Sequence, residues 1–135
     1  MTSERLPTQP GEWIDRSREI NFRFEGRQLT GYAGDVLSSA LWANGVRLFG
    51  RSFKYHRPRG LYSLANHDAN LMVEDDTRTN LRGDMLAIEV GLDVHAVNTL
   101  GGLERDRLRV FEKFSSFLPR GLDDISCHTP PPLVP

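Results

Sequence analysis

The residues best suited to chemistry lie close together, in the stretch GRSFKYHRPRG from Gly50 to Gly60. It holds four of the 17 basic residues of the chain, together with a Phe, a Tyr and a His. With Arg47 added, five cations fall within thirteen positions, and no Asp or Glu occurs between Val36 and His67. Clustered positive charge without nearby acids favours a phosphate group or a carboxylate-rich surface as the ligand.

Two further features of this stretch bear on how it binds. Its aromatic residues can stack on a planar ring, as they do beside arginines in many binding sites. Pro58 fixes its own φ angle and holds the preceding residue extended, which predicts a stiff ridge. The alternative is a solvated loop whose arginines pair with acidic residues of the same domain, namely Asp75, Asp76 or Asp84.

The rest of the sequence offers no self-contained catalytic constellation. The four histidines lack the spacing of metal ligands, and the serines lack the flanking glycines and the base of an activated nucleophile. Glycine fingerprints of phosphate-binding loops and dinucleotide folds are absent. The single cysteine, Cys127, cannot form an internal disulfide or hold an iron–sulfur cluster by itself. We therefore expect no metal site, no cofactor bound by this chain alone and no catalysis by it alone.

Composition places the chain among ordinary soluble domains. Its 135 residues suffice for one hydrophobic core, with 39% hydrophobic residues, 26% charged residues and a net charge of −1. This near-neutral charge gives no overall argument for binding nucleic acid or a membrane. No apolar run approaches the roughly 20 residues of a membrane span, and the N-terminus lacks the pattern of a secretory signal. These observations predict a cytoplasmic protein.

Hydrophobic periodicity predicts an α+β fold. Apolar and polar residues alternate over 20–24, as in a half-buried strand, and a second strand returns over 28–32. A helix over 36–45 follows, with Asp35 as its N-cap. This order of elements is typical of a β-grasp fold, in which a small mixed sheet wraps one helix. The further elements that we expect are strands over 46–49, 71–74 and 85–90 and a C-terminal helix over 103–118.

The chain is predicted to have four parts. A flexible lead-in rich in proline and polar residues precedes the β-grasp domain, and a helical extension and a disordered, proline-rich tail follow it. The expected boundaries are 1–17, 18–98, 99–121 and 122–135.

Two long strings of residues resemble a known family. GDVLSSALWANGVRLFGRSFKYHRPRGLYS, continued by NLMVEDDTRTNLR, is similar to the N-terminal domain of heterotetrameric sarcosine oxidase alpha subunits. Alpha subunits of amine, proline and opine-type dehydrogenases and of hydrogen cyanide synthase are related alternatives. The resemblance covers residues 20–121, breaks at about Leu122, and implies a ferredoxin-like β-grasp fold.

The same resemblance bears on metal binding. Some members of this group hold a [2Fe–2S] cluster through four cysteines in the loop after the RPRG string. The resemblance aligns those positions with Ser63, Asp68, Leu71 and Asp84, none of which is a thiol. Because leucine has no atom that binds iron, we expect the cluster to be absent, as it is in sarcosine oxidase alpha subunits.

The function that the resemblance implies is non-catalytic. The chain would be a structural or docking component of a complex that demethylates sarcosine oxidatively and carries FAD, FMN and NAD. Lys54, His56, Arg57 and Arg59 are then expected to contact a cofactor phosphate or acidic residues of partner subunits. Two alternatives stay open: a freestanding module that binds single-stranded nucleic acid, which the near-neutral charge disfavours, and a truncated, non-functional alpha-subunit remnant.

Overall fold

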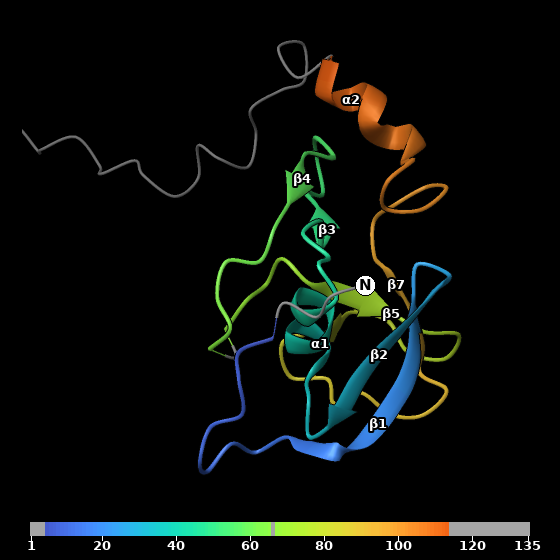
Figure 1. The fold of residues 1–135 in the computed structure, drawn as a ribbon. Coiled ribbons are helices and arrows are strands. Elements are labelled where there is room, and N and C mark those ends of the chain that lie inside the picture. The colour runs from blue at the N-terminus through green and yellow to red at the C-terminus, as the bar shows by residue number, and fades with distance from the viewer. Residues whose placement is uncertain (1–4, 66, 114–135) are drawn as a thin grey trace, which may run out of the picture.

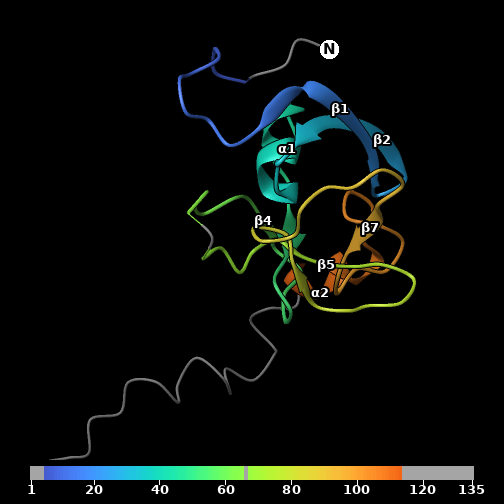
Figure 2. The ribbon, with the colours of Figure 1, turned by 90° about the horizontal axis from the view of Figure 1, so that it is seen from below.

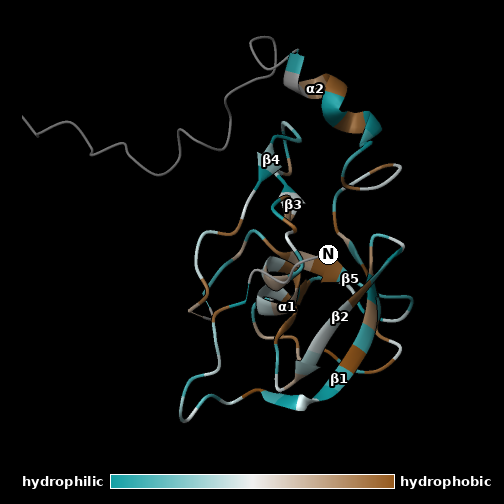
Figure 3. Cartoon of the chain, in the orientation of Figure 1, coloured by the Kyte–Doolittle hydropathy of each residue, from teal (hydrophilic) through white to brown (hydrophobic). Residues whose placement is uncertain are grey.

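The alternating residues near the N-terminus form the expected hairpin. In the computed structural model, which describes residues 5–65 and 67–113, strand β1 spans Asp15–Phe24 and strand β2 spans Arg27–Ala33. The two strands are antiparallel, and the turn between them has two residues with positive φ angles. Figure 3 shows the alternation of apolar and polar residues along β1. The apolar residues of this strand that are buried are Ile20, Phe22 and Phe24.

Five strands form one mixed sheet, in the order β2-β1-β7-β5-β6. Strand β5 spans Met72–Glu74, β6 spans Leu81–Arg82 and β7 spans Asp93–Ala96. The central strand β7 runs parallel to β1 and antiparallel to β5. Helix α1 (Leu37–Ala43) lies beside the β1–β2 hairpin (Figures 1 and 2). This mixed sheet with a single packed helix confirms the β-grasp prediction.

The core lies between the sheet and α1. Leu37, Ala40 and Leu41 recur at helical spacing and are fully buried, so one face of the helix is apolar. They belong to a single cluster with buried side chains of the strands, such as Phe22, and with Phe49, which directly precedes β3. Each fully buried side chain of this size contributes about 1.5–3 kcal/mol, and the cluster therefore fixes the sheet on which the candidate site is built.

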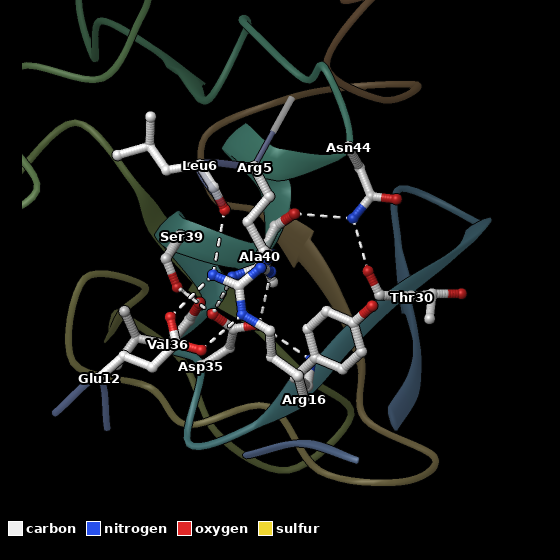
Figure 4. Close-up of polar contacts among 11 residues, drawn as sticks. Arg5, Leu6, Glu12, Arg16, Thr30, Asp35, Val36, Ser39, Ala40 and Asn44 are labelled. Atoms are coloured by element: carbon white, nitrogen blue, oxygen red, sulfur yellow. Dashed lines mark hydrogen bonds and ion pairs between the residues drawn. The ribbon is translucent and has the colours of Figure 1, made fainter. Parts of the chain in front are cut away.

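Asp35 is not the N-cap of this helix, contrary to the sequence prediction. Val36 occupies the N-cap position and makes no side-chain capping bond. The Asp35 carboxylate is almost fully buried. It accepts hydrogen bonds from both terminal nitrogens of the Arg5 guanidinium, at 2.9 and 2.7 Å. It also accepts a hydrogen bond from the Tyr32 amide. A further bond comes from the Ser39 hydroxyl (Figure 4). Asp35 therefore ties the segment before β1 to the start of the helix.

The later strands differ most from the prediction. The strand expected over 71–74 is confirmed as β5, whereas 46–49 and 85–90 form no strand. In the second of these ranges Ala87 makes one isolated bridge to Val36, because the chain there crosses the start of α1 rather than the sheet. The central strand β7 and the short β6 were not predicted, since each has too few residues to show a period.

A small second hairpin and a C-terminal helical segment lie together at one end of the molecule (Figure 1). Strand β3 (Gly50–Arg51) pairs with β4 (Pro58–Arg59), and we call residues 50–60 the basic hairpin. The 3-10 helix η1 (Arg107–Arg109) continues into α2 (Val110–Lys113). The remainder of the predicted helix and the tail lie outside the described residues. No helix in the described ranges is long and apolar enough to cross a membrane.

Candidate functional site

The basic hairpin is held by its own backbone. The Phe49 amide donates to the Arg59 carbonyl at 2.9 Å, and the Ser52 amide donates to the Arg57 carbonyl at 3.0 Å. His56 sits at the tip with a positive φ of 52° and donates its amide to the Ser52 carbonyl. The ridge expected from Pro58 is therefore a closed, hydrogen-bonded turn.

His56 points inward and not toward a ligand-accessible surface. The residue is 5% exposed, and Nδ1 lies 2.8 Å from a carboxylate oxygen of the buried Asp106. The other Asp106 oxygen accepts the amides of Leu100 and Leu108 at 2.9 and 3.1 Å. Phe111 of α2 packs on the His56 ring, with 6.2 Å between the ring centroids. His56 thereby joins the tip of the basic hairpin to the C-terminal segment.

Arg51 completes this buried network. Its Nε donates to the Leu103 carbonyl at 2.8 Å, and Nη1 donates to the His56 carbonyl at 2.8 Å. Nε also lies 3.8 Å from the Asp106 carboxylate, and both side chains are nearly inaccessible to solvent. One of the clustered cations is therefore used to hold the hairpin and is not available to a partner.

Asp106 makes the stability of this joint dependent on pH. Burial raises the pKa of its carboxyl. Hydrogen bonds from the Leu100 and Leu108 amides and from the His56 side chain lower this pKa by more than burial raises it, so the net shift is downward. A carboxyl with a depressed folded-state pKa stabilises the fold above its unfolded value of about 3.9 and loses that contribution at lower pH. We expect a difference in unfolding free energy between wild type and Asp106→Asn at about pH 5, where the Asp106 carboxyl is ionised. It should shrink as the pH falls below about 4 in urea titrations, and a constant difference down to pH 2 would contradict the assignment.

Three of the four predicted contact residues remain at the surface of the hairpin. The guanidinium of Arg57 lies 4.9 Å from the centre of the Tyr55 ring and the Lys54 ammonium lies 5.2 Å from it. Arg57 and Arg59 are exposed, and no carboxylate in the described part of the chain forms an ion pair with either. Two of the three acids considered as alternative partners are occupied elsewhere, since Asp75 binds Arg78 and Asp84 binds Arg82, whereas Asp76 is exposed.

A groove of about 380 Å³ opens beside the hairpin. Arg59 and the 75% exposed Phe53 lie on it, and Met72, Val97 and Asn98 come from the sheet side. The groove therefore combines a cation, for which the described residues offer no ion-pair partner, with an exposed aromatic ring and apolar surface. Such a set of groups suits a carboxylate-bearing protein segment better than a free metal or a neutral ligand.

The loop between β4 and β5 surrounds a second buried carboxylate. Asp68, in the middle of this loop, is only 1% exposed. One of its oxygens accepts the amides of Tyr62 and Ser63, and the other accepts the amide of Asn70 at 2.6 Å. Its own amide donates to the Asp84 carboxylate at 2.9 Å.

The four positions aligned with cluster ligands meet in this loop. Ser63, Asp68 and Asp84 are joined by direct hydrogen bonds, and the Leu71 carbonyl accepts the amide of Gly83, next to Asp84. The donors do not fit a [2Fe–2S] cluster, because thiolates are absent, Leu71 has no ligand atom and both carboxylates are engaged. Nowhere in 5–65 and 67–113 do three His, Cys, Asp or Glu residues group as a metal site would require.

Sequence reasoning missed Asp106 and the structural use of Arg51. Asp106 precedes η1 as its N-cap and accepts the Leu108 amide, a role for which aspartate is preferred. That preference was a usable signal, but the predicted helix was placed from residue 103 and hid it. The pairing of Asp106 with His56 spans 50 residues, and nothing local in the sequence marks it.

Comparison with known proteins assigns the family. A profile for the 2Fe-2S iron-sulfur cluster binding domain matches residues 17–99, which include α1 and nearly all of the five-stranded sheet. The chain belongs to this family. The family is thus one of cluster-binding domains, whereas the described residues of this member contain no group of three His, Cys, Asp or Glu side chains that could hold a metal ion.

Within this family, the chain is similar to alpha subunits of sarcosine oxidase. Sarcosine oxidase subunit alpha of Rhizobium meliloti (strain 1021) is 38% identical over 125 residues, which are 90% of this chain and 12% of that protein. The subunit of the same name from Corynebacterium sp. (strain P-1) is 38% identical over 79 residues, 57% of this chain and 8% of that protein. The expected resemblance to sarcosine oxidase alpha subunits is confirmed, and the chain spans only a small part of their length.

One solved structure supports the fold. The crystal structure of L-proline dehydrogenase from P. horikoshii matches with a TM-score of 0.52 and 22% identity, covering 61% of this chain and 16% of that chain. Likeness at this identity shows the fold alone. It agrees with the mixed sheet and single packed helix described above.

Proposed function

We propose that this chain is a cluster-free, non-catalytic docking component of a sarcosine-oxidase-like amine oxidoreductase. The observation that carries the proposal is the Asp68 loop, where carboxylates at two positions aligned with cluster ligands accept backbone amides, including the amide of Ser63 at a third such position. The names of the relatives supply the enzyme class. A domain of this family without metal donors and without a catalytic constellation has binding as its remaining role.

The redox chemistry would then belong to other parts of the complex. We place FAD, FMN and NAD on those parts, because the chain has no glycine fingerprint for a nucleotide phosphate. The substrate would be sarcosine or a related secondary amine. The cytoplasmic location expected from the sequence forms part of the same proposal.

Docking would use the exposed side of the basic hairpin. Arg57, Arg59 and Lys54 supply positive charge, and the groove beside Phe53 and Arg59 supplies apolar surface. His56 would support docking indirectly, because its bond to Asp106 inside the domain holds the hairpin tip in place. The occupant would be an acidic segment of a partner subunit or domain, which meets Arg57 and Arg59 by charge complementarity.

The docking proposal predicts charge-dependent association. The test mixes the full chain with the Rhizobium meliloti sarcosine oxidase complex whose alpha subunit lacks the region that this chain matches. Binding is expected to weaken as the salt concentration rises. Arg59→Glu should weaken binding at least about tenfold, because repulsion between the new carboxylate and the acidic partner segment costs more than about 1.4 kcal/mol. Affinity is measured by calorimetry or by biosensor.

The matched control is Arg18→Glu, which reverses an exposed arginine of β1 on the other side of the domain. It should leave the affinity within about twofold. Equal losses for the two variants, or no association at low salt, would contradict the docking role. The chain alone should show neither flavin absorbance nor sarcosine-dependent peroxide.

A further inference from the structure

The strongest unexplained feature is the burial of Asp68 inside the loop that joins β4 to β5. A local Asx turn accounts for only one of its bonds, the one from the Asn70 amide two residues later. The bonds from the Tyr62 and Ser63 amides come from six and five residues earlier in the chain. The loop backbone therefore closes around the carboxylate from both sides, as backbone amides close around an anion in a nest.

This closed loop is also fixed to the sheet. The Asp68 amide donates to an Asp84 oxygen at 2.9 Å, and Arg82 of β6 binds the same carboxylate at 2.6 and 3.1 Å. Asp84 is itself 1% exposed. Two buried carboxylates, through bonds from backbone amides and from Arg82, thus connect the loop to β6.

We propose that the Asp68 carboxylate takes the structural place of the metal cluster in this domain, so that the loop is ordered without iron. A cluster organises such a loop through its ligands and through amide hydrogen bonds to its sulfurs. Asp68 supplies the same two things from a side chain: an anionic centre that receives three amides, and a connection through Asp84 to the sheet. The inference rests on the cluster-free state proposed above.

The inference has a consequence for the surface of the loop. Tyr62 is 80% exposed and Leu64 is 55% exposed, although the Tyr62 amide is bonded to the buried carboxylate. The backbone is thus ordered while the apolar side chains project into solvent. The shape of this surface then depends on Asp68 and is independent of iron supply and of redox state.

The test replaces Asp68 by asparagine in the full chain and follows amide hydrogen exchange by NMR. The asparagine oxygen can accept bonds on only one side, and its NH₂ group then faces donors on the other side. We expect exchange of the amides on that side, either Asn70 or Tyr62 and Ser63, to become at least about tenfold faster. Amides of the β1–β2 hairpin should stay within about twofold of wild type, and a uniform acceleration throughout the domain would overturn the local role.

Asp76→Asn is the matched control, since Asp76 is exposed and lies in a different loop. Unchanged loop exchange in Asp68→Asn relative to this control would overturn the inference. If the variant does not fold, the wild-type protein decides: in iron-free protein the Tyr62, Ser63 and Asn70 amides should exchange at least about a hundredfold more slowly than in an unfolded chain. Loop amides that gain protection only after ferrous iron and sulfide are added would overturn it, whereas bound iron in the purified chain would contradict the cluster-free proposal.

Discussion

Replacing Asp106 by alanine is expected to lower the free energy of unfolding by about 3–5 kcal/mol, the range found when one partner of a buried charged pair is removed. The substitution leaves the Leu100 and Leu108 amides without acceptors and removes the partner of the His56 ring. It also leaves Arg51 without the nearby carboxylate. Urea denaturation of both proteins measures the difference.

Glu104→Ala is the control for this experiment. Glu104 lies two residues away in sequence, but its side chain is 77% exposed and its ion pair with Arg27 is 3.8 Å long. Its loss should change stability by less than about 0.5 kcal/mol. An Asp106→Ala effect as small as that of the control would show that the network adds nothing to stability.

A double-variant cycle separates the network from its parts. If Asp106 and His56 act together, the loss in Asp106→Ala/His56→Ala should be smaller than the sum of the two single losses. Additive losses would mean that the two side chains stabilise different parts of the fold. The cycle matters for function, because the proposed docking surface depends on this bond to hold the hairpin tip.

The parts of the fold that were predictable have a strong local period. The alternation of β1 and the apolar face of α1 are each visible within about ten residues, and the long family-like string fixed the β-grasp topology around them. The basic stretch was singled out because its charges and aromatic rings are contiguous in the sequence, whereas its pairing as a hairpin was not predicted. Local patterns thus predicted where these elements lie in the sequence, but not which residues they contact in the fold.

What could not be predicted is decided by long-range contacts. Strand β7 has four residues, and its place in the sheet depends on backbone pairing with β1 on one side and β5 on the other. Asp35 looked like a helix cap, but Arg5, 30 residues earlier, takes its carboxylate. His56 looked like a surface ligand until Asp106, 50 residues later, proved to be its partner. For both polar residues, the residue type indicated that the side chain makes a polar contact. The local sequence did not indicate which distant residue is the partner.

The two glycines that bound the basic hairpin should respond oppositely to alanine. A Cβ atom at Gly50 would lie well inside contact distance of the Asn70 carbonyl oxygen. That backbone cannot give way easily, because the Asn70 amide is bonded to Asp68. Gly50→Ala is therefore expected to cost at least about 2 kcal/mol, in the range of overpacked sites. At Gly60 the nearest atom is the Arg47 carbonyl oxygen at 3.4 Å, an ordinary contact, and φ is not in the left-handed region.

Gly60→Ala should consequently be neutral, or stabilising by up to about 1 kcal/mol through the lower entropy of the unfolded chain. Urea denaturation of both variants measures the contrast, and the partner-binding assay adds a functional reading. Because Gly50 pairs with Arg59, a shift at Gly50 should displace that arginine and weaken docking, whereas Gly60→Ala should not. Equal stabilities of the two variants would mean that the loop around Asp68 yields to the hairpin, contrary to the rigidity inferred for it.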